Sequence, residues 1–264
     1  MKKIIRFLLN GKVLPVLGSQ LKGMKLRVSP VFAFTLFWKN TEPEKHYAYK
    51  IFIKDNDVIF DIGANTGMHS YFFAGSFKKT KVYAFEPLPA NADYIRDAIR
   101  LNKIDNIELI NAAVGAKAGD IYFNTGSNNS QGFITEQETS LKVKMESLDH
   151  FIETRQLVPN FIKIDVEGAE SKVLEGFKNH VEKLMPIMII ESHTPDNDRA
   201  IAAFFQQYPY IIYRLAAYEE CLKGKPFIAI KNLNSIWPDP DGVWGNIVAI
   251  PESANGNYAG YVQN

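Results

Sequence analysis

A chain of 264 residues with 46% hydrophobic and 22% charged residues has the composition of an ordinary globular protein. Its length suits one α/β domain with additions, or at most two small domains. The formal net charge of +1 argues against general nucleic-acid binding by the whole chain, although the first 40 residues carry eight Lys and Arg and no acidic residue. We therefore expect no nucleic-acid partner.

The single cysteine, Cys221, excludes an intrachain disulfide and cannot build a zinc site alone, which fits a cytoplasmic protein. In residues 1–25 the apolar runs are short and interrupted by Arg6, Asn10 and Lys12. They reach neither the roughly 18–20 apolar residues of a membrane span nor the about 7–15 of a signal-peptide core. This segment could be a basic amphipathic helix on an anionic membrane, but a helix packed on the domain is the simpler interpretation.

Residues 1–50 are predicted to form an N-terminal extension, and residues 51–264 the main domain. Within the extension, Val31–Trp38 is apolar and aromatic, as in a strand or a buried helix. A helix is predicted to follow, with Thr41 as its N-cap, a proline in the first turn and Glu44 three residues after the cap. The acidic side chains at this helix start would cap it, or would reach the amino group of a bound ligand.

From residue 58 onward, apolar strands alternate with helices. The five strands expected first are Val58–Asp61, Val82–Glu86, Ile107–Ile110, Phe161–Asp165 and Ile187–Glu191. The expected helices are Thr66–Phe77, Pro89–Asn102, Ser147–Glu153, one that opens at Val166, and Pro195–Tyr208. Two final strands are expected at Tyr210–Leu215 and Asn246–Ile250. This order predicts an α/β fold in three layers, with a seven-stranded Rossmann-like sheet.

An insertion is predicted between the third strand of this sheet and the fourth. Asp120–Phe123 and Leu141–Met145 alternate well enough to be strands. The polar segment Asn124–Thr139 between them is predicted to be a loop, either a lid over a substrate or a loose surface loop.

The stretch Asp57–Gly67, with the sequence DVIFDIGANTG, reads as a buried strand, a glycine turn and a helix start. Gly63 and Gly67 let the backbone turn sharply and approach a ligand, and the free N–H groups of the helix start then face it. A dinucleotide fingerprint needs three glycines, but position 65 is Asn and position 68 is Met. The Gly-Lys-Ser/Thr of a P-loop is also absent. A strand-end acid followed by G-x-N-x-G is instead the pattern of S-adenosylmethionine-dependent methyltransferases.

Over roughly residues 40–250, the chain resembles the FkbM family of S-adenosylmethionine-dependent methyltransferases. The matching stretches are EPE at Glu42–Glu44, VIFDIGANTG at Val58–Gly67, VYAFEP at Val82–Pro87, NAAVG at Asn111–Gly115, FIKIDVEGAE at Phe161–Glu170 and IIES at Ile189–Ser192. The resemblance implies O-methylation, often of a sugar or polyketide hydroxyl, with S-adenosyl-L-methionine as the cofactor. The acceptor itself is not implied, because substrates in the family vary widely.

The candidate cofactor-binding residues lie at strand ends, because ligands of open α/β sheets bind there. Glu86 follows Asp61 by 25 residues and would accept both ribose hydroxyls, unless it serves as a capping or ion-paired residue. Asn111 and Ala112 would leave room for the adenine. The turn formed by Gly63, Ala64, Asn65 and Gly67 would hold the methionine end, and Asp61 would order that turn or its ligand.

Asp165, Glu191 and His193 are the candidate catalytic residues. Asp165 would stand next to the sulfonium, where it could bind the cofactor's amino group, hold a metal or act as a base. A histidine near its free pKa of about 6.5 is a natural general base for the acceptor hydroxyl, and a carboxylate could do the same work. The three residues could alternatively hold Mg²⁺ or Mn²⁺, although we expect no metal. Glu167 is expected only to cap the following helix.

Three functions compete at this point. The first is an O-methyltransferase for a carbohydrate-like, glycolipid or natural-product acceptor. The second is a nicotinamide-dependent oxidoreductase on a similar sheet, which the missing third glycine disfavours. The third is a protein that binds S-adenosylmethionine without catalysis. The basic N-terminus adds the hypothesis that the acceptor is bound to a membrane.

Overall fold

The computed structural model describes residues 11–18, 21–28, 42–125, 132–135 and 137–263. The predicted apolar segment Val31–Trp38 and the first ten residues of the predicted membrane contact lie outside these ranges. No helix within the described ranges is long and apolar enough to cross a membrane.

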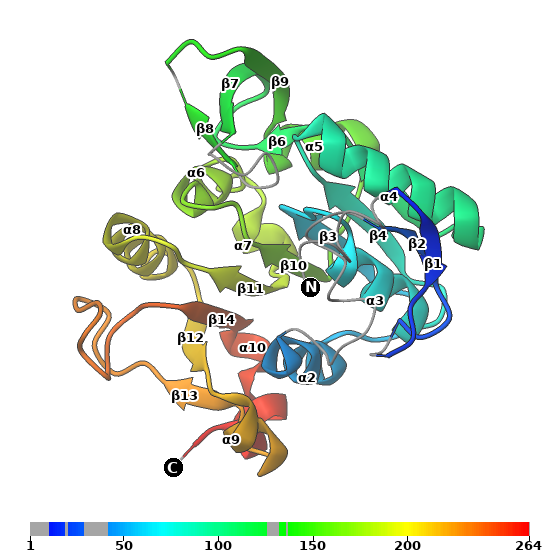
Figure 1. The fold of residues 1–264 in the computed structure, drawn as a ribbon. Helices are drawn as coiled ribbons and strands as arrows, with labels where there is room; N and C mark the ends of the chain where they lie inside the picture. Colours follow the sequence, from blue (N-terminus) through cyan, green and yellow to red (C-terminus); the bar gives the residue numbers. More distant parts are fainter. Residues whose placement is uncertain (1–10, 19–20, 29–41, 126–131, 136, 264) are drawn as a thin grey trace.

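The middle layer is an eight-stranded sheet. Its strands are β3 (Val58–Ile62), β4 (Lys81–Phe85), β5 (Ile107–Ile110), β10 (Phe161–Ile164), β11 (Ile187–Glu191), β12 (Tyr210–Leu215), β13 (Phe227–Ala229) and β14 (Asn246–Pro251). Their order is β13-β12-β14-β11-β10-β3-β4-β5 (Figure 1). The strands from β11 to β5 pair in parallel, whereas β14 pairs antiparallel with β11 and β12. The predicted three-layer sheet is confirmed, and the short edge strand β13 adds an eighth strand to the expected seven.

Helices cover both faces of the sheet. On one face lie α2 (Pro43–Phe52), α3 (Met68–Ser76) and α4 (Pro89–Asn102), and on the other lie α5 (Leu148–Arg155), α6 (Glu170–Glu175), α7 (Val181–Leu184) and α8 (Pro195–Phe205). Short helices α9 (Tyr218–Leu222) and α10 (Glu252–Asn255) and a 3₁₀ helix at Gly256–Tyr261 complete the C-terminal part. Alternate side chains of a strand point to opposite faces, so Ile59 packs in one core layer and Phe60 and Ile62 in the other. Because both faces of the central parallel strands are buried, most of their residues are apolar, and Asp61 of β3 and Lys163 of β10 are buried exceptions.

The starts of α2 and α6 differ from the sequence predictions. The N-cap of α2 is Glu42 rather than Thr41, which itself lies outside the described residues, and Glu42 makes no side-chain capping bond. Helix α6 begins at Glu170, not near Val166. Glu167 and Gly168 have φ angles of 54° and 104°, which a right-handed helix cannot include.

A second, four-stranded sheet is inserted between β5 and α5. It consists of β6 (Ala113–Val114), β7 (Gly119–Thr125), β8 (Gly132–Thr135) and β9 (Leu141–Glu146), in the order β6-β9-β7-β8. The predicted loop Asn124–Thr139 is therefore partly wrong, because the end of β7 and all of β8 lie within it. Phe123 of β7 packs against Leu88, at the start of α4, and Met145 of β9, so the insertion is attached to the main domain by apolar contacts.

The described part of residues 11–28 packs on the main domain, but it forms a hairpin where a helix was predicted. The hairpin of β1 (Val13–Pro15) and β2 (Lys25–Arg27) lies against α4, where Arg27 Nε is 2.7 Å from Asp97 Oδ2. Val16, Leu26 and Val28 join the core layer on that face. The division into 1–50 and 51–264 remains a prediction.

Candidate active site

An open pocket lies at the carboxyl ends of β3, β4 and β10. Its empty volume is about 690 Å³, which includes open solvent at its mouth. Five of the predicted site residues line it: Gly63, Asn65, Glu86, Ala112 and Asp165. Sequence reasoning missed the apolar wall made by Phe85, Leu88, Val114 and Phe123, and also Asn91. Phe123 comes from the inserted sheet, whose position no motif in the sequence indicates.

The glycine turn after β3 is held against both neighbouring strands. The N–H groups of Gly63 and Ala64 donate to the carbonyl of Phe85, at 3.0 and 2.9 Å. On the other side, the buried Lys163 donates from Nζ to the carbonyl oxygen of Gly63 at 2.9 Å. Gly63 has a φ of 76°, and a Cβ at this position would lie 1.8 Å from the carbonyl oxygen of Asp165. Only glycine fits at position 63, as a sharp turn requires, whereas the close approach of this turn to a ligand stays a prediction.

Glu86 is 5% exposed and follows β4 directly, so its carboxylate forms part of the pocket floor. One carboxylate oxygen accepts a hydrogen bond from the N–H of Asn65 at 2.8 Å, and the other from the N–H of Leu88 at 2.9 Å and Asn91 Nδ2 at 3.3 Å. Burial raises the pKa of Glu86 to about 7, even though these hydrogen bonds favour the ionised form. The side chain thus ties the glycine turn to the start of α4.

Asp61 and Asn111 have supporting positions, and neither is among the residues that line the pocket. Asp61 is fully buried, accepts a hydrogen bond from Ser70 Oγ at 2.5 Å and has Lys163 Nζ at 3.3 Å. This agrees with the prediction that Asp61 orders the turn. The Asn111 amide donates to the backbone carbonyls of Glu86 and Pro87, at 2.7 and 3.2 Å, so it orders the segment around Glu86.

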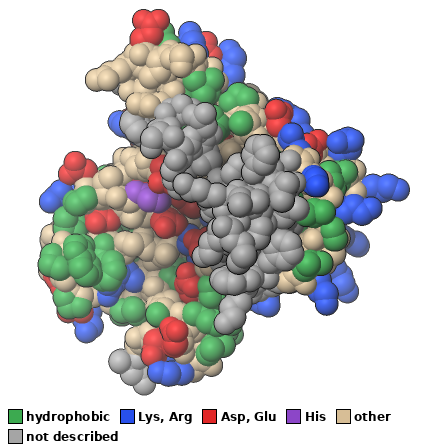
Figure 2. All heavy atoms as spheres, in the orientation of Figure 1, with side chains coloured by type: hydrophobic (Ala, Val, Ile, Leu, Met, Phe, Trp, Pro, Cys, Tyr) green, Lys and Arg blue, Asp and Glu red, His purple; other side chains and the backbone are tan. Residues whose placement is uncertain are grey.

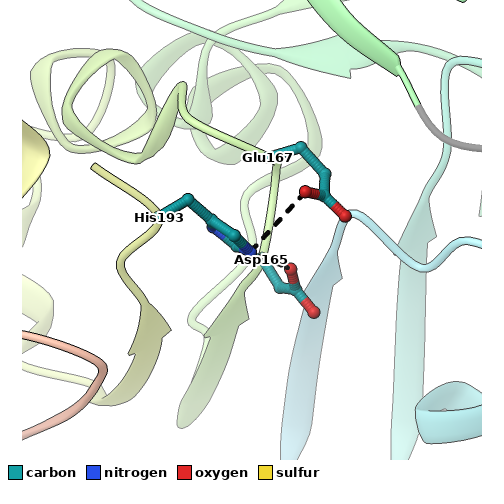
Figure 3. Close-up of side chains that lie close together, drawn as sticks. All are labelled: Asp165, Glu167 and His193. Carbon is teal, nitrogen blue, oxygen red and sulfur yellow. Dashed lines mark ion pairs between the residues drawn. The ribbon is translucent and has the colours of Figure 1, made fainter. Parts of the chain in front are cut away.

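Asp165, Glu167 and His193 lie together next to this pocket (Figure 3). Asp165 and Glu167 follow β10, and His193 follows the adjacent strand β11. His193 Nε2 is 3.6 Å from Asp165 Oδ1 and 3.7 Å from Glu167 Oε2. Burial opposes ionisation of Asp165, but the charges of Lys163 and Lys45 hold its pKa below the usual range.

The other ring nitrogen of His193 contacts Glu170, at the first position of α6. His193 Nδ1 is 2.8 Å from Glu170 Oε1, and Glu170 is completely buried. This hydrogen bond raises the pKa of His193 to about 9, against the effect of burial. The imidazole is therefore protonated at neutral pH in the ligand-free chain and is not the free base that its ordinary pKa would suggest. Sequence reasoning quoted Glu170 within the FIKIDVEGAE motif but gave it no role.

One carboxylate oxygen of Glu191 forms an ion pair with Lys45 of α2 and so faces away from His193 toward that lysine. Its second oxygen is 4.0 Å from His193 Nε2, so Glu191 borders the group around His193. Lys45 is 1% exposed and also pairs with Glu42, which in turn is 3.0 Å from His69 Nε2. The acidic residue that was expected to cap α2 or to reach a ligand therefore pairs with Lys45 and His69.

The space-filling view shows a histidine side chain, left of the middle of the molecule, next to several acidic side chains in a hollow (Figure 2). Sequence reasoning placed Asp165, Glu191 and His193 together as a metal-binding alternative. In the structure, the third residue of this group is Glu167 and not Glu191. The possible metal-ligating atoms of Asp165, Glu167 and His193 all lie within 4.8 Å of one another. The prediction that Glu167 caps a helix is wrong, because α6 starts three residues later with Ala169 as its N-cap.

The order of the sheet, with its antiparallel strand β14 between β11 and β12, defines the class I methyltransferase fold. The chain belongs to the FkbM methyltransferase family, because the sequence model of the Methyltransferase FkbM domain matches residues 61–212. The resemblance seen in the sequence is thereby confirmed.

Two relatives and one solved structure illustrate the similarity. Hexuronic acid methyltransferase AglP of Haloferax volcanii is 30% identical over 142 residues, which cover 53% of this chain and 57% of the relative. The 2-O-methyltransferase NoeI of Sinorhizobium fredii is 26% identical over 150 residues, covering 49% and 61%. The crystal structure of the FkbM methyltransferase from Methylobacillus flagellatus matches with a TM-score of 0.50 and 17% identity, over 83% of this chain and 52% of that one. The matches thus span little more than half the length of these proteins.

Proposed function

We propose that this protein is an O-methyltransferase that uses S-adenosyl-L-methionine and methylates a hydroxyl group of a carbohydrate-like acceptor. The observation that carries the proposal is the pocket at the strand ends, which is lined by the buried carboxylate of Glu86 and by Asp165. Membership of a methyltransferase family supports the same reaction type over the nicotinamide alternative.

The residues of the pocket fit the parts of this cofactor. Phe85, Leu88 and Phe123 offer an apolar wall for the adenine ring, with the small Ala112 next to them. Glu86 would accept the ribose hydroxyls, since a carboxylate oxygen has room for more than one hydrogen bond. The glycine turn would hold the methionine end.

The group around Asp165 would receive the amino group of the cofactor and the acceptor hydroxyl. When bound, S-adenosylmethionine supplies a methyl group activated by its sulfonium charge. A protonated His193 would donate a hydrogen bond to the acceptor and hold its oxygen in line. The proton released from the hydroxyl would pass to a flanking carboxylate, Asp165 or Glu191, because a protonated imidazole cannot accept it.

The acceptor class rests on the relatives. One is named for hexuronic acid and the other for transfer to a 2-oxygen, and both names fit hydroxyl groups of sugars or sugar acids. A contact of residues 1–25 with a membrane that carries such an acceptor remains a prediction, which liposome co-sedimentation with and without this segment would test.

Calorimetric titration with S-adenosylhomocysteine tests the cofactor assignment. The wild-type chain is expected to bind it, and Glu86→Ala to bind at least about 100-fold more weakly, because two hydrogen bonds to a charged group are worth about 3 kcal/mol or more. Glu182→Ala, which removes an exposed carboxylate of α7, should bind as the wild type does. No binding by the folded wild-type chain would refute the proposal. Binding without methylation across a panel of sugar and uronic acid acceptors would favour the non-catalytic alternative.

A further inference from the structure

The group formed by Asp165, Glu167 and His193 has the dimensions of a metal site. Their ligand atoms all lie within 4.8 Å of one another, and His193 Nε2 lies 3.6 and 3.7 Å from the two carboxylate oxygens (Figure 3). Two ligands of one cation, each bound at about 2.1 Å, are separated by roughly 3 to 4.2 Å. A single ion therefore fits between these atoms with little movement of the side chains.

The second observation is the buried carboxylate behind His193. Glu170 is completely buried, and its Oε1 lies 2.8 Å from His193 Nδ1. Its Oε2 has no hydrogen-bond partner among the described residues. Histidines that bind metals almost always donate their other ring N–H to a carboxylate or carbonyl, which fixes the ring and directs the free nitrogen to the ion. Glu170 holds His193 in this way, with Nε2 directed toward Asp165 and Glu167.

Charge supports a cation at this place. Within the described part of the chain, the connected ion pairs contain two ammonium groups, two imidazoles and six carboxylates: Lys45, Lys163, His69, His193, Glu42, Asp61, Asp165, Glu167, Glu170 and Glu191. Even with both imidazoles protonated, two negative charges are left over. A divalent cation that takes the place of the proton on His193 would reduce this excess from two negative charges to one.

We propose that Asp165, Glu167 and His193 bind one divalent cation of the Mg²⁺ or Mn²⁺ class, with Glu170 as the positioning residue for His193. Two carboxylates and one imidazole suit these ions, which complete their coordination with water or a substrate oxygen. The role of the ion rests on the proposed function: it would bind the acceptor hydroxyl and lower its pKa, so that a nearby carboxylate can take the proton. With the ion bound, His193 Nε2 holds the ion in place of its proton, so the ion and not the imidazolium would hold the acceptor oxygen. Glu191, which is not among the three ligands, would then take the proton of the hydroxyl.

Titration of the full chain with MnCl₂, followed by the electron paramagnetic resonance signal of free Mn²⁺, tests the site directly. We expect one ion per chain, and at least tenfold weaker binding in Glu167→Gln and in His193→Gln. Glu170→Gln should weaken binding by about 10- to 100-fold while all three ligands remain. His150→Gln is the matched control, because it removes an exposed imidazole whose Nδ1 is 2.9 Å from a single carboxylate, Glu146. The control should bind Mn²⁺ like the wild type.

Two results would overturn the proposal: no Mn²⁺ binding by the folded wild-type chain, or the same affinity in Glu167→Gln, His193→Gln and the wild type. A parallel titration with saturating S-adenosylhomocysteine should still find one Mn²⁺ site. Loss of that site would instead assign the carboxylates to the cofactor's amino group. A wild-type chain that binds S-adenosylhomocysteine but not Mn²⁺ refutes only the cation site. A wild-type chain that binds Mn²⁺ but not S-adenosylhomocysteine refutes only the proposed function.

Discussion

At the residue scale, Glu86 combines two properties that normally oppose each other. It is buried next to apolar side chains, yet the proposed function requires it to accept hydrogen bonds as a carboxylate. No cation lies within ion-pair distance of it among the described residues, so burial dominates and its pKa rises to about 7. The protonation state of the empty pocket therefore changes near neutral pH.

This shift predicts that affinity for S-adenosylhomocysteine increases with pH. Below pH 7, most Glu86 side chains carry a proton that must be lost before both ribose hydroxyls can donate to the carboxylate. The ionised fraction rises about tenfold between pH 6 and pH 8, and the association constant should rise by about the same factor. Calorimetry at pH 6, 7 and 8 measures this, and Glu86→Gln should remove most of the dependence. Equal affinities of the wild type at pH 6 and pH 8 would contradict the assignment.

Gly63 and Gly75 offer a matched comparison of two glycines in one strand–turn–helix unit. Gly63→Ala places a Cβ 1.8 Å from the carbonyl oxygen of Asp165 at a φ of 76°, so it should cost about 2–5 kcal/mol of unfolding free energy and abolish cofactor binding. Gly75→Ala lies on the exposed side of α3 with nothing within 4 Å of the new Cβ, and should stabilise the chain by about 0.5–1 kcal/mol. Urea unfolding of both variants tests the pair. A Gly63→Ala variant as stable as the wild type would contradict the close packing of this turn.

At the element scale, the sequence predicted best those elements whose local signals agree. Pro89–Asn102 and Ile107–Ile110 are found with their predicted bounds, because a proline starts the helix and the mostly apolar strand stands between Asn106 and Asn111. β8 and β13 were missed, since these short strands stand in segments rich in Gly, Asn and other turn-forming residues and depend on their pairing partners β7 and β12. Site residues at strand ends were predictable, because ligands of open α/β sheets bind at the carboxyl ends of the strands. The contact of Lys45 with Glu191 was not predictable from the sequence, because the two residues are 146 positions apart and meet only when α2 packs on the sheet.

The ion pair of Lys45 with Glu191 attaches helix α2 to the carboxyl end of β11. Lys45→Ala leaves Glu191 and Glu42 without their shared cation. Because these carboxylates are 31% and 36% exposed, the loss should be smaller than the about 3–5 kcal/mol of a fully buried ion pair. We expect this loss of stability together with faster hydrogen exchange of the α2 backbone amides. Lys50→Ala, on the exposed side of the same helix, should change neither quantity by much. Equal exchange in the two variants would show that the apolar contacts of Tyr49 and Phe52 suffice to hold α2.

At the scale of the whole molecule, the site is assembled from parts that lie far apart in the sequence. The glycine turn, Glu86 and the segment after β10 meet because parallel strands bring their carboxyl ends to one edge of the sheet. A ligand that contacts all three parts binds only to the folded chain, so it must raise the unfolding temperature.

The rise in unfolding temperature should distinguish the two cofactor classes. At 100 times its dissociation constant, S-adenosylhomocysteine adds about 2.7 kcal/mol to the unfolding free energy, which corresponds to roughly 5–10 °C for a chain of this size. NADH at the same concentration should leave the unfolding temperature unchanged, because the turn has Asn65 where a dinucleotide fingerprint needs its second glycine. Differential scanning fluorimetry of the wild type and Glu86→Ala with both ligands measures the effect. A shift with NADH but not with S-adenosylhomocysteine would reverse the assignment, and a shift with S-adenosylhomocysteine that survives in Glu86→Ala would place its ribose elsewhere in the pocket.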